Sequence, residues 1–258
     1  MTTANASNRF SNRVANYVRY RPGYPPDVLR CLADEFGLRA EHVAADVGSG
    51  TGIFTELLLQ AGHVVFAVEP NREMRGAAEQ QLAGHSGFHS VDGTAEATTL
   101  PDESVDWIVA AQAFHWFDVP RARAEAKRIL RPPGFAAVLW NNRREDTPFL
   151  AAYEAVLHAF SVDYAKIKHQ NAEEDGRIPL YFGGSNFARR AFVNRQPCDF
   201  DGLRGRTLSA SYMPAEDHPR YPAMVDALRK VFDAHAVGGT VVIEYETCVY
   251  AGKMLAER

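Results

Sequence analysis

The sequence predicts an α/β protein with a doubly wound, mostly parallel sheet, an antiparallel closing strand and a helical insertion. Two observations lead to this fold class. Short apolar runs alternate with amphipathic runs along residues 26–142, which is the order of β-α-β units. Residues 240–252 instead alternate apolar and polar side chains, as a half-buried antiparallel strand does. With 46% of its 258 residues hydrophobic, the chain can form one large core.

The first half of the chain supplies strands and helices in regular order. An amphipathic helix is expected at 26–37, and short apolar strands are expected at 42–48, 63–70, 87–93, 104–114 and 135–142. Helices are expected between them at 52–62, 71–84 and 119–134, each ended by glycine or by proline and glycine. Right-handed crossovers between parallel strands place ligands at the carboxyl ends of the strands.

The regular order stops after Asn142. One long helix or two short ones are expected at 147–167, a polar, glycine-containing loop or lid at 169–190, a strand at 190–200 and a helix at 218–239. We therefore expect three parts. These are an N-terminal lid and ligand-binding core (1–142), a helical insertion or cap (143–190) and a C-terminal part that completes the sheet (191–258).

Composition argues against several classes of partner. The net charge is −4 and the basic residues are scattered, so neither nucleic acid nor an anionic membrane surface is an expected partner. Three cysteines lie far apart and form no CxxC pair, which argues against a disulfide framework or a metal site. No signal peptide and no apolar run of about 18 residues is visible, so a cytoplasmic protein is expected.

A glycine loop follows the first strand. Gly48, Gly50 and Gly52 occupy alternate positions in DVGSGTG, directly after Asp46. A phosphate-binding loop of the Walker type needs a lysine that is absent here, and a dinucleotide fingerprint needs its third glycine at residue 53, which is Ile53. A carboxylate beside the loop disfavours a pyrophosphate and suits a cationic group such as an ammonium.

A second carboxylate ends the second strand. Glu69 follows Gly50 by 19 residues, at the position where nucleotide-binding α/β folds place an acid that accepts hydrogen bonds from ribose hydroxyls. A ligand with a ribose, a positively charged end and no phosphate is S-adenosylmethionine. The loop and this acid together therefore indicate that cofactor.

Residues 40–142 resemble the class I S-adenosylmethionine-dependent methyltransferases, which have a seven-stranded Rossmann-like fold. The stretches that carry the resemblance are DVGSGTG, AVEPNREM, VDGTAEATTLPDESVDWIVAAQAFHWFD and ILRPPGFAAVLWN. The stretches AFHWF and YVRYRPGYP are more specifically similar to a type 11-like small-molecule subgroup that includes trans-aconitate methyltransferase-like proteins.

The resemblance implies positions around the cofactor. The loop residues that would wrap its methionine part are Gly48, Ser49, Gly50 and Gly52. Asp46 and the backbone carbonyl of Gln112 would lie at the ammonium, and Glu69 would hold the ribose diol. Residues implied at the adenine are Pro70, Met74, Thr94, Ala95 and Glu96; many relatives have aspartate in place of Thr94, and Glu96 is a candidate substitute. The lid would contain Tyr17, Tyr20 and Arg21.

Methyl transfer by in-line displacement needs alignment, and it needs a general base only when the acceptor loses a proton. His115 is the first candidate base and Tyr20 the second. His115 and Trp116 end the fourth strand and either face the acceptor or pack in the core. For an acidic acceptor, either Arg21 or Arg143 would pair with spare carboxylates; alternatively, Arg143 is simply solvated.

The sequence therefore predicts an S-adenosylmethionine-dependent methyltransferase that acts on a small-molecule acceptor and releases S-adenosylhomocysteine. Two alternatives stay open: a non-catalytic protein that binds either form of the cofactor, and an NAD-dependent oxidoreductase, which the glycine spacing disfavours.

Overall fold

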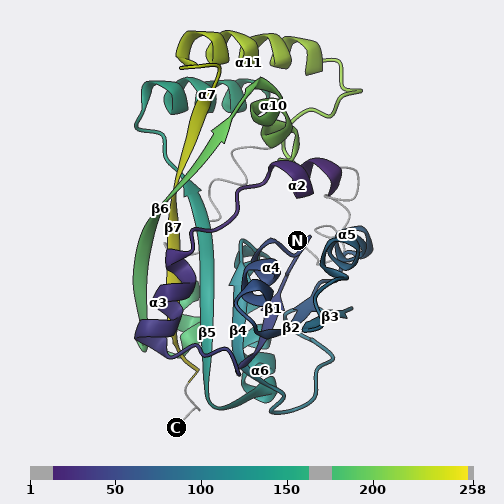
Figure 1. The fold of residues 1–258 in the computed structure, drawn as a ribbon, viewed down its shortest axis with the longest axis vertical. Helices are drawn as coiled ribbons and strands as arrows, with labels where there is room; N and C mark the ends of the chain where they lie inside the picture. Colours follow the sequence, from purple (N-terminus) through teal and green to yellow (C-terminus); the bar gives the residue numbers. More distant parts are fainter. Residues whose placement is uncertain (1–13, 163–175, 255–258) are drawn as a thin grey trace.

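The computed structural model describes residues 14–162 and 176–254 and contains a seven-stranded sheet with helices on both faces (Figure 1). The strand order is β3-β2-β1-β4-β5-β7-β6, and β7 runs antiparallel to both of its neighbours while the other pairs are parallel. The strands are β1 (Val43–Val47), β2 (Val64–Val68), β3 (Phe88–Val91), β4 (Val105–Ala111), β5 (Leu130–Arg143), β6 (Phe187–Cys198) and β7 (Val241–Lys253). The predicted fold class is confirmed.

The helices that cover the sheet have local signals at their ends. Side chains cap four of the helices, and the predicted cap of α5 is confirmed, because Asn71 Oδ1 accepts from the Met74 N–H at 2.8 Å. The helices are α2 (Val14–Tyr20), α3 (Asp27–Phe36), α4 (Ile53–Gln60), α5 (Arg72–Leu82), α6 (Val119–Ile129), α7 (Pro148–Phe160), α9 (Arg177–Phe182), α10 (Phe200–Leu208) and α11 (Tyr221–His235), with a short 3₁₀ helix, η2 (Phe114–Trp116).

The central strands are buried on both faces. Along β4, Trp107 and Val109 pack in one apolar cluster with α3, α4 and α5. Ile108 and Ala110 point the other way and pack in a second cluster with α6 and α9. A parallel sheet buried on both faces explains why its strands are continuous apolar runs in the sequence. Their carboxyl ends are the edge that remains open to a ligand.

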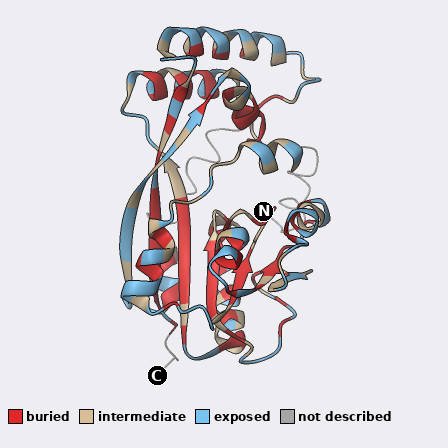
Figure 2. Cartoon of the chain, in the orientation of Figure 1, coloured by how far each residue is buried: buried red, intermediate tan, exposed pale blue. Residues whose placement is uncertain are grey.

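A helical layer lies beyond this edge (Figures 1 and 2). Helices α7, α10 and α11 form a third apolar cluster with the adjoining ends of β6 and β7, and Leu150, Leu203, Leu228 and Ile243 are fully buried there. Helix α2 contacts both α10 of this layer and α5 of the core. The layer draws on both the predicted insertion and the predicted C-terminal part, and the division into three parts stays a prediction.

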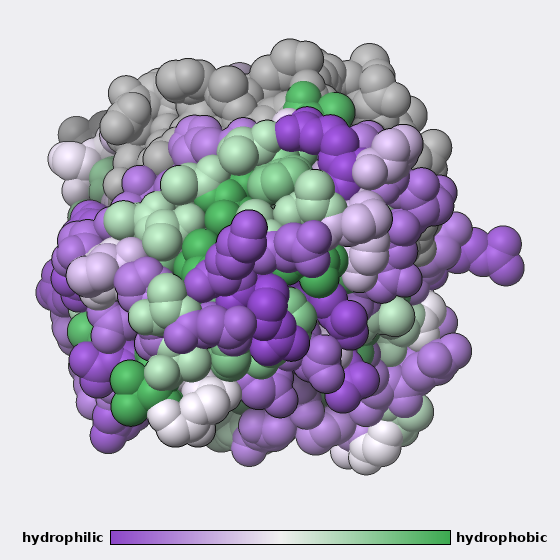
Figure 3. All heavy atoms as spheres, turned by 90° about the horizontal axis from the view of Figure 1, so that it is seen from above, coloured by the Kyte–Doolittle hydropathy of each residue, from purple (hydrophilic) through white to green (hydrophobic). Residues whose placement is uncertain are grey.

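The outer face of the helical layer has a mixed surface. Viewed from above, apolar side chains gather in a band near its middle, with hydrophilic side chains around it (Figure 3). Within residues 14–162 and 176–254, no helix has both the length and the apolar character to cross a membrane. The same residues hold no group of three or more His, Cys, Asp or Glu that could bind a metal. The predicted cytoplasmic location and absence of a metal stay predictions.

Two local expectations were wrong, and one helix was not predicted. The helix expected at 119–134 ends at Ile129, because Leu130 pairs with Val105 and begins β5 through an irregular register. The loop expected at 169–190 contains α9 and the start of β6 in its described part. Helix α10 was not expected, because Gly202 and Gly205 lower its helix propensity; the Asp199 cap and burial in the helical layer stabilise it.

Candidate cofactor and acceptor site

The three glycines of the loop have different surroundings. All have positive φ, which is 73° at Gly48, 59° at Gly50 and 85° at Gly52. A Cβ at Gly48 would overlap the side chain of Ala113, and one at Gly52 would lie 2.7 Å from Leu82 Cδ1. At Gly50 no neighbouring atom would be closer than 3.9 Å. Packing within the protein therefore requires two of the glycines, whereas Gly50 leaves room for a ligand.

Glu69 joins the glycine loop to the start of α5. Its side chain is buried, with the residue 7% exposed. Oε2 accepts from the Gly50 N–H at 2.9 Å, and Oε1 accepts from the Asn71 N–H at 2.8 Å. Burial raises the pKa of Glu69, and these two backbone donors partly oppose that rise. A carboxylate offers about four acceptor sites, so each oxygen retains capacity for a ligand hydroxyl.

Asp46 at the end of β1 has an oxygen without a partner. Oδ2 accepts from Thr55 Oγ1 at 2.7 Å, whereas Oδ1 is buried and has no hydrogen bond. Burial raises the pKa of Asp46 to about 7; the Thr55 hydroxyl opposes the rise and the charge of Glu69 adds to it. A nearby cation would lower this pKa and satisfy Oδ1. The free oxygen therefore fits an ammonium group.

Further unsatisfied polar atoms belong to the same loop and to the lid. They are Ser49 Oγ, Thr51 Oγ1 and Arg21 Nε, all buried without a hydrogen bond. Buried polar atoms are normally hydrogen-bonded, so the two hydroxyls fit the polar methionine end of the predicted cofactor, and Arg21 Nε is a donor that can serve an anion. Gln112 at the end of β4 has a φ of 59°. A left-handed backbone at a non-glycine residue costs about 1–3 kcal/mol and is typical of ligand sites.

The residues predicted at the adenine lie after β2, in the first turn of α5 and in the loop after β3. Met74 and Ala95 are buried, whereas Pro70 is exposed. Thr94 pairs with the main chain of residue 97 through two hydrogen bonds, which folds the loop back on itself. Glu96 Oε1 accepts from the Asp118 N–H at 2.8 Å, at the start of α6.

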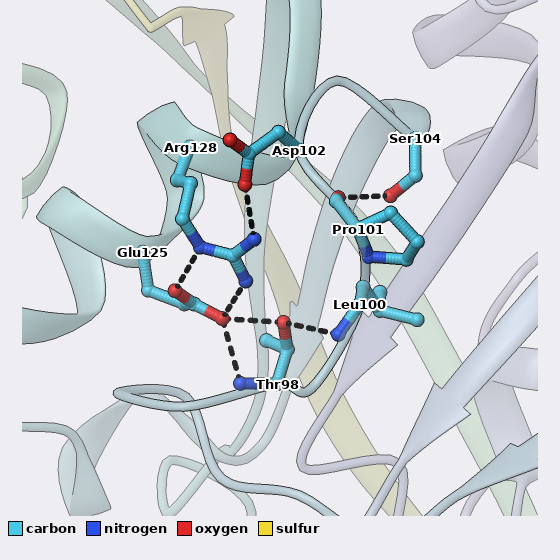
Figure 4. A network of polar contacts seen from close by, with 7 residues as sticks. All are labelled: Thr98, Leu100, Pro101, Asp102, Ser104, Glu125 and Arg128. Atoms are coloured by element: carbon cyan, nitrogen blue, oxygen red, sulfur yellow. Dashed lines mark hydrogen bonds and ion pairs between the residues drawn. The ribbon is translucent and has the colours of Figure 1, made fainter.

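A polar network fixes the next part of this loop to α6 (Figure 4). Glu125 Oε1 accepts from the N–H and the hydroxyl of Thr98 at 2.7 and 2.6 Å, and both of its oxygens accept from Arg128. Arg128 also donates to Asp102 at 2.6 Å. The Arg128 hydrogen bonds, with those of Thr98, lower the pKa of Glu125 to about 2.

Glu125→Ala is expected to lower the free energy of unfolding by about 2–3 kcal/mol, because charged hydrogen bonds are lost and Thr98 keeps no partner for its N–H. The depressed pKa means that this contribution is present above about pH 4.5 and is lost as pH falls toward about 2. Urea unfolding at about pH 7 and about pH 3 measures both effects. Asp102→Ala removes only an exposed partner of Arg128 and serves as the control. An equal loss of unfolding free energy in Glu125→Ala and Asp102→Ala would contradict the stabilising role that we assign to Glu125.

The chain after α2 is held against the sheet by side-chain amides. Nδ2 of Asn141 and Nδ2 of Asn194 donate to the Gly23 carbonyl at 3.1 and 2.8 Å. Gln196 Nε2 donates to the Tyr20 carbonyl at 2.8 Å. These donors come from β5 and β6, so the N-terminal lid is fixed by strands far from it in sequence.

The lid contains a tyrosine–arginine contact and, shortly after it, a partly buried tyrosine, Tyr24. The guanidinium of Arg21 lies 4.6 Å from the ring centre of Tyr17 and donates to the Ser209 carbonyl at 3.1 Å. Burial raises the pKa of Tyr24, and the charges of Tyr17 and Asp46 add to the rise. The Tyr24 ring packs edge-on against Phe54 of α4, with 5.1 Å between the ring centres. Tyr24 was not among the predicted residues, although YRPGYP contains it.

The aromatic turn after β4 presents His115 and packs its neighbours. In η2 (Phe114–Trp116), Phe114 is fully buried, and His115 and Trp116 are half-buried. Arg177 donates to the carbonyls of residues 114, 115 and 117 at 3.3, 3.3 and 2.6 Å. Burial, with the charges of Arg177 and Arg21, lowers the pKa of His115 to about 4. No motif in the sequence indicated Arg177, which positions this turn.

Two predicted residues have other neighbours. The ring of Tyr20 packs on α10 at Gly205, where a Cβ would overlap it. Arg143 forms an ion pair with Glu154, with side chains 11% and 8% exposed, and its guanidinium lies 5.2 Å from the ring centre of Tyr153. Arg143 is therefore not a solvated residue. Its charge is balanced within the helical layer, so we do not include it in the proposed acceptor site.

Comparison with known proteins identifies the family of the chain. The family model described as a methyltransferase domain matches residues 45–138. An uncharacterized methyltransferase of Schizosaccharomyces pombe is 33% identical over 228 residues, or 86% of this chain and 87% of the relative. A Mycobacterium tuberculosis protein, also an uncharacterized methyltransferase, is 40% identical over 140 residues, and this match spans about half of each chain, 53%.

Solved structures show the same fold. A protein from Anaeromyxobacter dehalogenans assigned as a type II methyltransferase matches 92% of this chain and 100% of its own, with a TM-score of 0.68 and 24% identity. The chain belongs to the class I S-adenosylmethionine-dependent methyltransferases. The narrower similarity to trans-aconitate methyltransferase-like proteins stays a prediction.

Proposed function

We propose that this protein transfers a methyl group from S-adenosylmethionine to a small-molecule acceptor. The observation that carries the proposal is the buried, unpartnered Oδ1 of Asp46 beside a glycine loop whose Gly50 leaves room for a ligand. Glu69 bonds to the same loop. The Asp46 carboxylate beside the loop would repel the pyrophosphate of a dinucleotide and suits an ammonium, and the Glu69 carboxylate suits a ribose diol.

In this proposal the cofactor lies across the carboxyl ends of β1, β2 and β4. Asp46 and the carbonyl of Gln112 bind the ammonium, and Glu69 accepts from both ribose hydroxyls. Met74 and Ala95 contact the adenine. Further contacts come from Gly48, Ser49, Gly50, Gly52, Pro70, Thr94 and Glu96, with Tyr17 and Arg21 in the lid.

When bound, the cofactor supplies an electrophilic methyl group on a sulfonium that leaves as a neutral thioether. The chain contributes alignment, which is worth up to about 7–11 kcal/mol in favourable cases. Arg177 fixes the turn that carries His115, and the lid with the helical layer covers the ligand side of the sheet. With a pKa of about 4, His115 is neutral near pH 7, so a ring nitrogen can accept a proton from the acceptor, although it is a weaker base than an unperturbed histidine. Tyr20 is the less favoured base, because its ring packs on α10.

Calorimetry with S-adenosylmethionine, S-adenosylhomocysteine and NAD tests the cofactor. We expect S-adenosylmethionine and S-adenosylhomocysteine to bind and NAD not to bind. Tighter binding of NAD than of these two ligands would overturn the proposal. Turnover is then measured as S-adenosylhomocysteine released with a panel of small acids, phenols and amines. Cofactor binding without turnover on any member would favour the non-catalytic binding protein instead.

The pH dependence of turnover tests His115. For an acceptor that loses a proton, His115→Gln is expected to lower kcat by about 10²–10⁴. In the unmodified protein the base form of His115 is lost only as pH falls through about 4, so kcat/KM should show no His115 limb near pH 6.5. His89→Gln, an exposed histidine on β3, is the matched control. A limb near pH 6.5 that disappears in His115→Gln would contradict the lowered pKa.

A further inference from the structure

Two arginines from distant parts of the chain meet at one serine. Arg206 of α10 donates from Nη1 to Ser209 Oγ at 3.4 Å. Arg21 of the lid donates from Nη2 to the Ser209 carbonyl at 3.1 Å. Arg206 is 7% exposed, and Arg21 Nε is buried without a hydrogen bond. Two positive charges therefore lie close together where the lid meets the helical layer.

No carboxylate of the described chain balances these charges. Within residues 14–162 and 176–254, neither guanidinium has an Asp or Glu oxygen within the 4.0 Å of an ion pair. Arg206 Nε donates to the Tyr245 hydroxyl at 3.0 Å, and that hydroxyl donates to Gln196 at 3.1 Å. These partners are neutral. The buried Glu154 is paired with Arg143 and His158.

Such an arrangement is costly without an anion. Burying a cation costs several kcal/mol unless it is paired, and a neighbouring like charge adds to the cost. Burial and then the charge of Arg206 lower the pKa of Arg21, whereas the phenols of Tyr245, Tyr153 and Tyr212 raise the pKa of Arg206. A carboxylate between the two guanidiniums would remove both penalties, and each planar guanidinium matches its two oxygens.

The position of this pair relates it to the acceptor. Arg206 belongs to the helical layer, whereas the cofactor residues belong to the core sheet. Arg21 is close enough to His115 for its charge to lower the pKa of that histidine. An anion held by both arginines would therefore lie where the lid meets the helical layer, rather than among the core-sheet residues that we assign to the cofactor.

We propose that Arg206 and Arg21 bind a carboxylate of the methyl acceptor, so that the substrate is a small organic anion. This inference rests on the proposed function. The carboxylate anchors the acceptor, and the tyrosine hydroxyl next to Arg206 supplies a further donor when it turns from Gln196.

The test uses the full chain saturated with S-adenosylhomocysteine and pairs of probes that differ only in charge: benzoate and benzamide, succinate and succinamide, glutarate and glutaramide. Calorimetry is expected to show that at least one acid binds and that its amide does not. Arg206→Gln should lower the affinity for that acid by about 30-fold or more, and Arg206→Lys should lower this affinity less. Arg204 is an exposed arginine on the same helix, so Arg204→Gln should leave the affinity for the acid unchanged.

The outcomes separate this inference from the proposed function. Failure of the unmodified protein to bind S-adenosylhomocysteine would overturn both. Normal cofactor binding with no acid preferred over its amide would overturn the carboxylate site alone. A carboxylate of the cofactor is the other source of an anion, so Arg206→Gln is also titrated with S-adenosylhomocysteine and its decarboxylated analogue. If Arg206→Gln loses affinity for S-adenosylhomocysteine but not for the decarboxylated analogue, Arg206 binds the carboxylate of the cofactor, and the proposal is overturned. A lower Tm with unchanged acid affinity would show a structural role and also overturn it.

Discussion

Gly50→Val is expected to weaken S-adenosylhomocysteine binding by about 100-fold or more, equivalent to at least about 2.7 kcal/mol. Gly50 has a φ of 59°, and its hypothetical Cβ would point into a space where the nearest atom, Met74 Sδ, is 3.9 Å away. A branched side chain would fill the space that we assign to the cofactor. Valine also strains a left-handed backbone, so the N–H that reaches Glu69 would shift.

Gly37→Val separates ligand exclusion from backbone strain. Gly37 ends α3 with a φ of 73° and has no atom within 4 Å of a hypothetical Cβ. Both variants should lose stability by about 1–2 kcal/mol from the left-handed conformation. Only Gly50→Val should lose cofactor affinity, measured by calorimetry at a temperature where both variants are folded. Unchanged affinity in Gly50→Val would show that the loop is purely structural.

Glu69→Gln is expected to weaken S-adenosylmethionine binding by about 1.5–3 kcal/mol, or roughly 10- to 150-fold. The carboxylate accepts from Gly50 and Asn71 with separate oxygens, and an amide has only one oxygen to offer. The substitution therefore removes charged hydrogen bonds to the ribose and disturbs the loop. Glu56→Gln on the exposed side of α4 changes the net charge equally and should have no effect.

A ribose analogue separates the two consequences of Glu69→Gln. In the unmodified protein, 2′-deoxy-S-adenosylhomocysteine should bind more weakly than S-adenosylhomocysteine, because a hydroxyl donor to Glu69 is missing. In Glu69→Gln that difference should shrink. The same difference in both proteins would mean that Glu69 supports the loop without contacting the ribose.

The sequence by itself determined the sheet and its ligand edge. Strand, turn and helix follow one another within about 20 residues there, so local patterns specify them, and the carboxyl ends of parallel strands must meet at one edge. Asp46 and Glu69 could be predicted as neighbours for that reason. The structure confirms the fold and places Gly50 in contact with the Glu69 carboxylate.

Tertiary structure decided the elements after β5. Helix α9 has six residues and follows a polar stretch, and burial of Ile178, Tyr181 and Phe182 against α6 stabilises it. Helix α10 contains two glycines, one of which lies directly under the Tyr20 ring. Propensity is a weak signal in both segments, and packing against distant elements overrides it.

The tertiary structure also decided which charges of the site are balanced. Arg143 follows a strand in sequence, but only the fold shows that Glu154 of α7 balances it. Arg21 and Ser209 are 188 residues apart, and Arg206 reaches the same serine from α10. A sequence shows that an arginine is present. Whether its charge is balanced depends on which groups the folded chain brings within a few ångströms, because electrostatic attraction and desolvation both act through space.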